Sequence, residues 1–254
     1  MQTKRLDAEN PFDCVHMKYI FAPHTVVGLP VAGQSECFPV RRVYCVGRNY
    51  AAHAREMGFD PDREPPFFFC KPNDAQSVIA VPPDTTVSIP YPPETNNYHY
   101  EIELVVAIGK SGKSGKDIPL ENAGDYIFGY AVGLDMTRRD LQIKMREQGR
   151  PWEIGKAFDY SAPIGMLHPK SETGEMNSAE ISLTVNGEVK QKSDISHLIW
   201  SVNETIAKLS TLFELHPGDL IFSGTPDGVG AVKSGDTLHG FIQGLSPLTV
   251  KVTP

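Results

Sequence analysis

Cysteine is scarce in this chain, and the few cysteines form no recognisable pattern. The 254 residues include four, at Cys14, Cys37, Cys45 and Cys70, and no two of them make a C-x-x-C pair. This spacing indicates neither a zinc site nor a redox motif, and a disulfide framework is not expected in a chain of this length. We therefore expect free thiols and a cytoplasmic location.

Long apolar runs and clusters of positive charge are also missing. No stretch approaches the roughly 20 apolar residues of a membrane-spanning helix, and the N-terminus lacks the apolar segment of a secretory signal. The formal net charge is -7, and no run of Lys or Arg offers a nucleic-acid surface. The Gly- and Lys-rich run 109–116 lacks the pattern of a phosphate-binding loop. Neither membranes nor nucleic acids are expected partners.

What the chain does contain is the composition of a globular protein. Hydrophobic residues make up 40% and charged residues 22%, which is ordinary for a folded domain with a substantial core. Residues 1–16 are polar, and prolines break the apolar segments up to residue 40. We therefore predict an N-terminal tail with a small β segment at 1–40 and one β-rich domain at 41–254.

Three local signals predict individual elements. Asn186-Gly187 lies between alternating segments and predicts a two-residue hairpin turn. Ser201 and Glu204 predict a capping box at a helix start, and Thr137 with Asp140 gives a similar signal.

The stretch 99–108 alternates in its first half and is apolar in its second, which predicts one strand that runs from a wet edge into the core. Glu101 and Glu103 lie two residues apart, so they share a strand face. Two carboxylates entering a core would be costly without a cation, which favours a site for magnesium or manganese before zinc. The alternative is a solvated strand face with two ordinary glutamates.

Asp135 ends a second predicted strand, at 127–136, just before the predicted helix start. A carboxylate at a strand end that faces a cleft is suited to be a third metal ligand. The alternative is a simple turn residue.

His53 and Glu56 lie three residues apart on a predicted helix at 49–58, on one helical face. A carboxylate beside an imidazole raises its basicity and fixes its tautomer, as deprotonation of water requires. The alternative is a surface ion pair on a short helix.

Lys156 and Thr225 are two further candidates. Lys156 has apolar neighbours, so it could bind an anion or extend to solvent. Thr225 lies in a glycine-rich loop at 223–230, which could approach a ligand closely or simply connect two strands tightly.

Taken together, these residues resemble the fumarylacetoacetate hydrolase family. The matching motifs occur in family order over roughly residues 43 to 252. They are Gly47-Arg48-Asn49-Tyr50 with His53 and Glu56, Lys71-Pro72, Glu101-x-Glu103, Asp135 with Arg139-Asp140 and Gln142, Gly155-Lys156 with Phe158, Asn186-Gly187, and Gly224-Thr225-Pro226 with Gly228-Val229-Gly230. Within the family, the runs 41–69 and 133–139 look most like fumarylpyruvate hydrolases.

The resemblance implies an α+β fold, in which a mixed β-roll is flanked by short helices, and a homodimer. It implies Mg²⁺ or Mn²⁺ on Glu101, Glu103 and Asp135. The helix that carries His53 and Glu56 would act as a lid.

The implied reaction is metal-dependent cleavage of the C–C bond of an acylpyruvate, with fumarylpyruvate giving fumarate and pyruvate. His53 and Glu56 would activate water, and Lys156 would steady the developing oxyanion or a substrate carboxylate. The expected substrate-binding residues are Arg48, Tyr50, Arg139, Gln142 and Thr225, with Gln142 and Thr225 holding the pyruvate carboxylate.

Two alternatives stay open. The same enolate chemistry serves oxaloacetate decarboxylation or isomerisation of a diene-dioate, although the pair His53 and Glu56 favours hydrolysis. A non-catalytic β-rich binding module would instead be indifferent to chelators and to His53→Ala.

Overall fold

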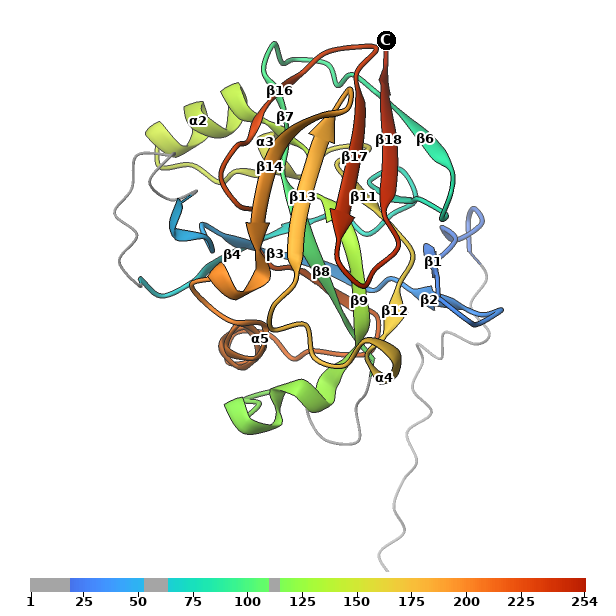
Figure 1. The fold of residues 1–254 in the computed structure, drawn as a ribbon, viewed down its shortest axis with the longest axis vertical. Helices are drawn as coiled ribbons and strands as arrows, with labels where there is room; N and C mark the ends of the chain where they lie inside the picture. Colours follow the sequence, from blue (N-terminus) through green and yellow to red (C-terminus); the bar gives the residue numbers. More distant parts are fainter. Residues whose placement is uncertain (1–18, 53–63, 110–114) are drawn as a thin grey trace, which may run out of the picture.

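The computed structural model describes residues 19–52, 64–109 and 115–254, and the two largest of its sheets pack against each other (Figure 1). The larger sheet is mixed, with parallel β15 (Asp219–Phe222) and β3 (Arg42–Gly47) beside antiparallel β8 (Ile102–Ile108) and β9 (Ile127–Leu134). This arrangement confirms the predicted α+β class. In spatial order the larger sheet contains β4 (Phe67–Lys71), β3 (Arg42–Gly47), β15 (Asp219–Phe222), β8 (Ile102–Ile108), β9 (Ile127–Leu134), β11 (Ala162–Ile164) and β5 (Val78–Ala80), and β12 (His168–Pro169) pairs with β9.

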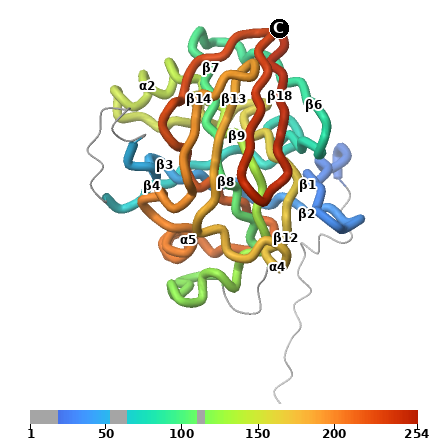
Figure 2. The backbone as a smooth tube through the Cα atoms, in the orientation of Figure 1, coloured from blue at the N-terminus to red at the C-terminus, as the bar shows by residue number. Residues whose placement is uncertain are grey.

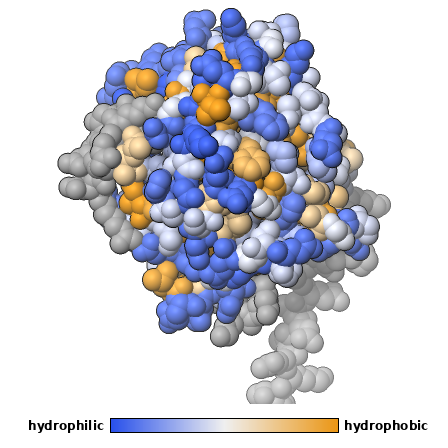
Figure 3. Space-filling view, viewed as in Figure 1, coloured by the Kyte–Doolittle hydropathy of each residue, from blue (hydrophilic) through white to orange (hydrophobic). Residues whose placement is uncertain are grey.

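The second sheet lies in front of β8 and β9 in Figure 1. Buried and more exposed residues alternate along β13 and β17, as expected for a sheet with one face on the core. Figure 3 shows the outer face as mostly hydrophilic, with small hydrophobic spots. Asn186 and Gly187 both have positive φ in the predicted hairpin turn. In spatial order the strands are β14 (Glu188–Asp194), β13 (Glu180–Val185), β17 (Thr237–Ile242), β18 (Leu248–Thr253) and β6 (Thr86–Pro90).

β8 is buried on both faces, and its two faces contribute to different clusters. Ile102 and Leu104 belong to the core between the two sheets. Val105 and Ala107 face a second cluster on the other side of the large sheet, where β1 (Gly28–Pro30) and β2 (Cys37–Pro39) also contribute. Glu103 alternates in step with Val105 and Ala107, so it lies on this second face of the large sheet.

A small sheet joins β10 (Thr137–Arg138), β7 (Tyr98–Tyr100) and β16 (Gly230–Val232). The single strand predicted for 99–108 is therefore wrong, because β7 pairs in this small sheet and β8 in the large one. Glu101 lies at the corner between them, outside either strand.

The helices are short and lie around the sheets, with α2 at one side and α4 and α5 at the lower end (Figure 2). The predicted capping box of Ser201 and Glu204 is present. No helix in the described ranges is long and apolar enough to cross a membrane. Cys37, Cys45 and Cys70 carry free thiols, as predicted, and Cys14 lies outside the described residues. The helices that lie wholly within the described ranges are η2 (Leu120–Tyr126), α2 (Arg139–Glu147), α3 (Glu153–Lys156), α4 (Lys170–Thr173), η3 (Ile195–His197) and α5 (Val202–Ser210).

Candidate metal centre and active site

Sheet register brings three acidic residues together at the ends of β8 and β9. Ile102 lies opposite Leu134, which places Glu101 opposite Asp135, whose backbone N–H donates to the Glu101 carbonyl at 2.9 Å. Glu103 is two residues further along β8. The three carboxylates offer ligand oxygens that all lie within 4.8 Å of one another.

All three carboxylates are buried, with 4%, 2% and 0% of Glu101, Glu103 and Asp135 exposed. Burial, followed by the charges of Asp135 and Glu101, raises the pKa of Glu103 well above its usual range. Glu103 accepts a hydrogen bond from the Gly224 N–H at 2.7 Å. Among the described residues no basic side chain forms an ion pair with it, so Glu103 is the least compensated of the three charges.

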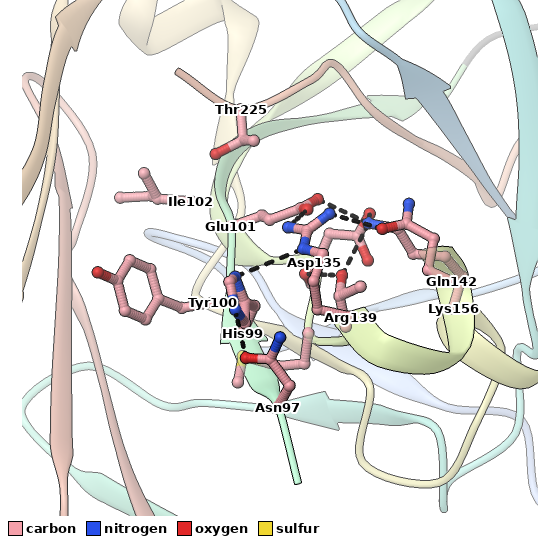
Figure 4. A network of polar contacts seen from close by, with 12 residues as sticks. Asn97, His99, Tyr100, Glu101, Ile102, Asp135, Arg139, Gln142, Lys156 and Thr225 are labelled. Carbon is pink, nitrogen blue, oxygen red and sulfur yellow. Dashed lines mark hydrogen bonds and ion pairs between the residues drawn. The ribbon is translucent and has the colours of Figure 1, made fainter. Parts of the chain in front are cut away.

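Lys156 lies beside Glu101 and Asp135, as Figure 4 shows. Its ammonium donates to Glu101 Oε2 at 2.6 Å, Asp135 Oδ2 at 2.7 Å and Thr137 Oγ1 at 2.8 Å, which uses all three of its protons. Burial lowers the pKa of Lys156, but the carboxylates of Asp135 and Glu101 outweigh it and leave the pKa raised. The predicted alternative of a solvent-exposed lysine is therefore wrong, because the ammonium pairs with two buried carboxylates.

Two more cations complete the centre. The ammonium of Lys71 forms an ion pair with Asp135 Oδ1 at 2.8 Å and donates to the carbonyls of Met136 and Lys156. Arg139 pairs with Glu101 through one nitrogen and donates to Gln142 Oε1 at 2.6 Å through another. The sequence motifs include Lys71 but predict no role for it. The signal that could have identified it as part of the site is a lysine at the end of an otherwise apolar strand.

The donor set fits a hard divalent ion. Glu101 and Asp135 have cationic partners, whereas Glu103 has none among the described residues, so a divalent ion among the three carboxylates would supply the positive charge that Glu103 lacks. Carboxylate oxygens are ligands that Mg²⁺ and Mn²⁺ prefer. Glu101, Glu103 and Asp135 would hold the ion, and this role stays a prediction.

A pocket opens over the acidic group. It is lined by Val46, Gly47, Arg48, Phe69, Glu101, Glu103, Asp135, Arg139, Gln142, Ile143, Arg146, Trp152, Lys156 and Thr225. Four of the five predicted substrate-binding residues are in this set.

The other predicted residues lie elsewhere. Tyr50 does not line this pocket, because it is buried and bridges Leu198 through the backbone. Burial, followed by the charge of Glu103, raises the pKa of Tyr50 above its usual range. The predicted pair His53 and Glu56, with most of its helix, lies outside the described residues.

The loop after β15 brings its backbone against the site. Gly224 has φ 103°, and a Cβ there would lie 2.7 Å from the Cβ of Asn49, so the position requires glycine. Its N–H reaches Glu103, as described above. The neighbouring Thr225 accepts a hydrogen bond from Gln191 Nε2 at 2.9 Å, which leaves its hydroxyl proton available to donate into the pocket.

The comparison that decides the family is a match to the sequence model "Fumarylacetoacetate (FAA) hydrolase C-terminal" over residues 42–253. The chain belongs to the fumarylacetoacetate hydrolase family. The family resemblance drawn from the sequence is thereby confirmed.

Several members of the fumarylacetoacetate hydrolase family are similar over most of this chain. The crystal structure of fumarylpyruvate hydrolase from Pseudomonas aeruginosa in complex with Mn²⁺ and pyruvate is 63% identical, has a TM-score of 0.89, and matches 93% of this chain and 99% of that one. A fumarylpyruvate hydrolase of Ralstonia sp is 43% identical over 77% of this chain and 96% of its own length. A mitochondrial oxaloacetate decarboxylase of Dictyostelium discoideum is 40% identical over 81% and 90%, respectively. Other relatives are named as oxaloacetate tautomerases.

Proposed function

We propose that this protein is a metal-dependent hydrolase that cleaves fumarylpyruvate, an acylpyruvate, to fumarate and pyruvate. The observation that carries the proposal is the buried group of Glu101, Glu103 and Asp135 around Lys156 at the base of a pocket. The similar Pseudomonas aeruginosa structure, described as a complex with Mn²⁺ and pyruvate, supports both the ion and the product.

The reaction needs water to attack one carbonyl and a stable leaving group at the next carbon. Water adds to the carbonyl carbon of the fumaryl group, and the bond from this carbon to the adjacent methylene breaks. The electron pair of that bond leaves on the pyruvate half as its enolate, which takes up the proton that water lost. A bound divalent ion would supply positive charge to the keto-acid oxygens and the enolate.

Two pocket residues are oriented as donors for the pyruvate carboxylate. The side-chain oxygen of Gln142 accepts from Arg139, so its amide NH₂ group is left to donate. The hydroxyl of Thr225 is likewise left to donate its proton, because Gln191 donates to its oxygen. Lys156 holds Glu101 and Asp135 in place, and His53 with Glu56 is proposed, on sequence grounds, to take the proton from water.

The test is a coupled assay for pyruvate with purified protein, fumarylpyruvate and Mn²⁺ or Mg²⁺, followed in parallel by loss of the enol absorbance. We expect pyruvate and fumarate in equal amounts, and no turnover after EDTA treatment until metal is restored. Absence of pyruvate with fumarylpyruvate and with acetylpyruvate would refute the proposal.

Oxaloacetate chemistry is the second candidate, because relatives named as acting on oxaloacetate are nearly as similar as the Ralstonia hydrolase. The same assay with oxaloacetate distinguishes the two candidates. We expect kcat/KM for fumarylpyruvate to exceed that for oxaloacetate by about tenfold or more.

The assembly and location are also proposals. We propose a homodimer in the cytoplasm, and sedimentation analysis of the purified protein tests the dimer directly.

A further inference from the structure

One face of α2 runs along the pocket. Arg139, Gln142, Ile143 and Arg146 all line it, and their spacing of three, four and seven residues is that of a single helical face. Arg139 pairs with Glu101, so its end of the helix lies at the acidic group. Arg146 is two turns further on, about 10 Å along the helix axis at about 1.5 Å per residue. The pocket therefore extends well beyond the acidic group.

A second arginine approaches this far part of the pocket from the large sheet. Arg48 follows β3, lines the pocket, and has its guanidinium 5.3 Å from the centre of the Phe67 ring. Burial, followed by the positive charge of Arg146, lowers the pKa of Arg48, while the charge of Glu64 acts in the opposite direction. Arg48 and Arg146 both line this pocket, so one ligand bound in it can contact both.

The backbone of Arg48 is also unusual. Its φ is 57°, in the left-handed region that residues with side chains seldom adopt. Such conformations concentrate at functional sites, where the surrounding structure holds a side chain in a required position. At Arg48 this conformation occurs where the chain leaves β3 and lines the pocket.

Between the two charged ends the pocket wall is mainly apolar. Val46, Phe69, Ile143 and Trp152 contribute to it. The rings of Phe69 and Trp152 have centroids 6.0 Å apart, so they form one aromatic surface. The pocket thus has three parts: the acidic group with its cationic partners, the apolar wall, and the pair Arg48 and Arg146.

We propose that Arg48 and Arg146 bind the far carboxylate of a dicarboxylate acylpyruvate and so select it over monocarboxylate and shorter substrates. The inference rests on the proposed function and names the substrate class. Arginine side chains are well suited to a carboxylate, which they bind through paired hydrogen bonds.

Molecular length supports this assignment. In fumarylpyruvate six C–C bonds separate the two carboxyl carbons, about 7 Å in an extended chain at roughly 1.2 Å per bond. The pyruvate carboxylate is assigned to Gln142, and Arg146 lies four residues, about 6 Å, further along α2, so a chain of that length reaches both. Oxaloacetate has three such bonds, about 4 Å, and is shorter than this span. The flat, conjugated middle of fumarylpyruvate fits the aromatic surface.

The first test compares fumarylpyruvate with acetylpyruvate, which shares the cleaved bond but lacks the vinyl group and the far carboxylate. In Arg146→Gln the ratio of kcat/KM for fumarylpyruvate to kcat/KM for acetylpyruvate is expected to fall about tenfold or more. The fall should come from a higher KM for fumarylpyruvate. Lys144→Gln is the matched control, because Lys144 is exposed on the same helix, and its ratio is expected to stay within about twofold of the wild-type ratio. Arg48→Asn, which keeps a residue tolerant of positive φ, is the second variant and should lower the ratio in the same way.

The second test measures binding without turnover. Calorimetry of the Mn²⁺-loaded protein compares 2-oxopimelate with 2-oxoheptanoate, which have the same length and differ in the terminal carboxylate. Wild type should prefer 2-oxopimelate by about tenfold or more, and Arg146→Gln should lose most of that preference.

The outcomes separate the two proposals. If wild type hydrolyses both substrates and Arg146→Gln and Arg48→Asn leave the ratio and the binding preference unchanged, the arginine subsite is wrong and the hydrolase stands. If wild type hydrolyses neither substrate, the hydrolase is wrong, and the subsite inference fails with it.

Discussion

Replacement of Glu103 by glutamine should change metal binding and stability of the metal-free protein in opposite directions. Glu103 is 2% exposed, and its ligand oxygen lies within 4.8 Å of those of Glu101 and Asp135. At an effective dielectric constant near 20, one such pair of charges repels by roughly 3 kcal/mol, of which Lys156 offsets a part. Glutamine keeps the shape and an acceptor for the Gly224 N–H while removing the charge. We therefore expect the metal-free variant to be more stable than wild type by about 1–2 kcal/mol at pH 8.

The gain in stability should depend on pH. The folded-state pKa of Glu103 is raised, so the carboxyl group stabilises the fold below its unfolded pKa and loses that contribution as pH rises through the folded value. The difference between Glu103→Gln and wild type should therefore be small near pH 4.5 and grow above it. Urea unfolding in EDTA at several pH values measures this.

Metal affinity should fall in the same variant. At a Mn²⁺ concentration of about 100 Kd for wild type, binding stabilises the fold by about 2.7 kcal/mol. If loss of one carboxylate weakens binding about 100-fold, the same concentration stabilises the variant by only about 0.4 kcal/mol. Glu121→Gln, at an exposed position, is the control and should behave as wild type. The reasoning is refuted if metal-free Glu103→Gln is less stable than wild type by more than about 1 kcal/mol, or if Mn²⁺ stabilises both equally.

Three further variants test separate parts of the site. Lys71→Met removes a buried partner of Asp135 and should lower the free energy of unfolding by about 3 kcal/mol in urea titrations; a loss below about 1 kcal/mol would mean that the pair contributes little. Gly224→Ala forces a side chain onto a positive φ and should cost about 1–3 kcal/mol and weaken Mn²⁺ binding, since its N–H holds Glu103; unchanged calorimetry would contradict this. His53→Ala should reduce kcat about 100-fold or more with Mn²⁺ affinity retained, and activity within about threefold of wild type would remove His53 from the mechanism.

Local signals in the sequence were enough to locate several elements. Asp135 directly follows β9, so it lies at the end of the strand as predicted from the apolar run before it. The turn at Asn186-Gly187 and the capping box of Ser201 and Glu204 are also as predicted. Each depends on residues a few positions apart, so the backbone conformation follows from short-range chemistry.

Two predictions failed where pairing between distant segments decides the structure. The stretch 99–108 divides at Glu101, because Tyr98–Tyr100 pairs with β10 and β16 and not with the large sheet. Thr137 does not cap α2, because it lies in β10 and its hydroxyl bonds with Lys156, while Asp140 accepts from Thr95. These competing partners are remote in sequence and leave no local pattern.

The acidic residues of the site, and Lys156 and Arg139 beside them, could be named from the sequence, but the ion pairs that these residues form could not. Lys71 and Lys156 reach Asp135 from segments 64 and 21 residues away, and only the sheet register brings them to one point. The position of Arg146 could have been found, since it lies seven residues after Arg139 on the predicted helix. Its relation to Arg48 required the fold.

The most direct measurement of the proposed metal centre is an anomalous difference map from crystals of the protein grown with Mn²⁺. We expect one strong peak about 2.2 Å from oxygens of Glu101, Glu103 and Asp135. A map with no peak among these three carboxylates, or with the ion bound elsewhere in the pocket, would contradict the proposed centre.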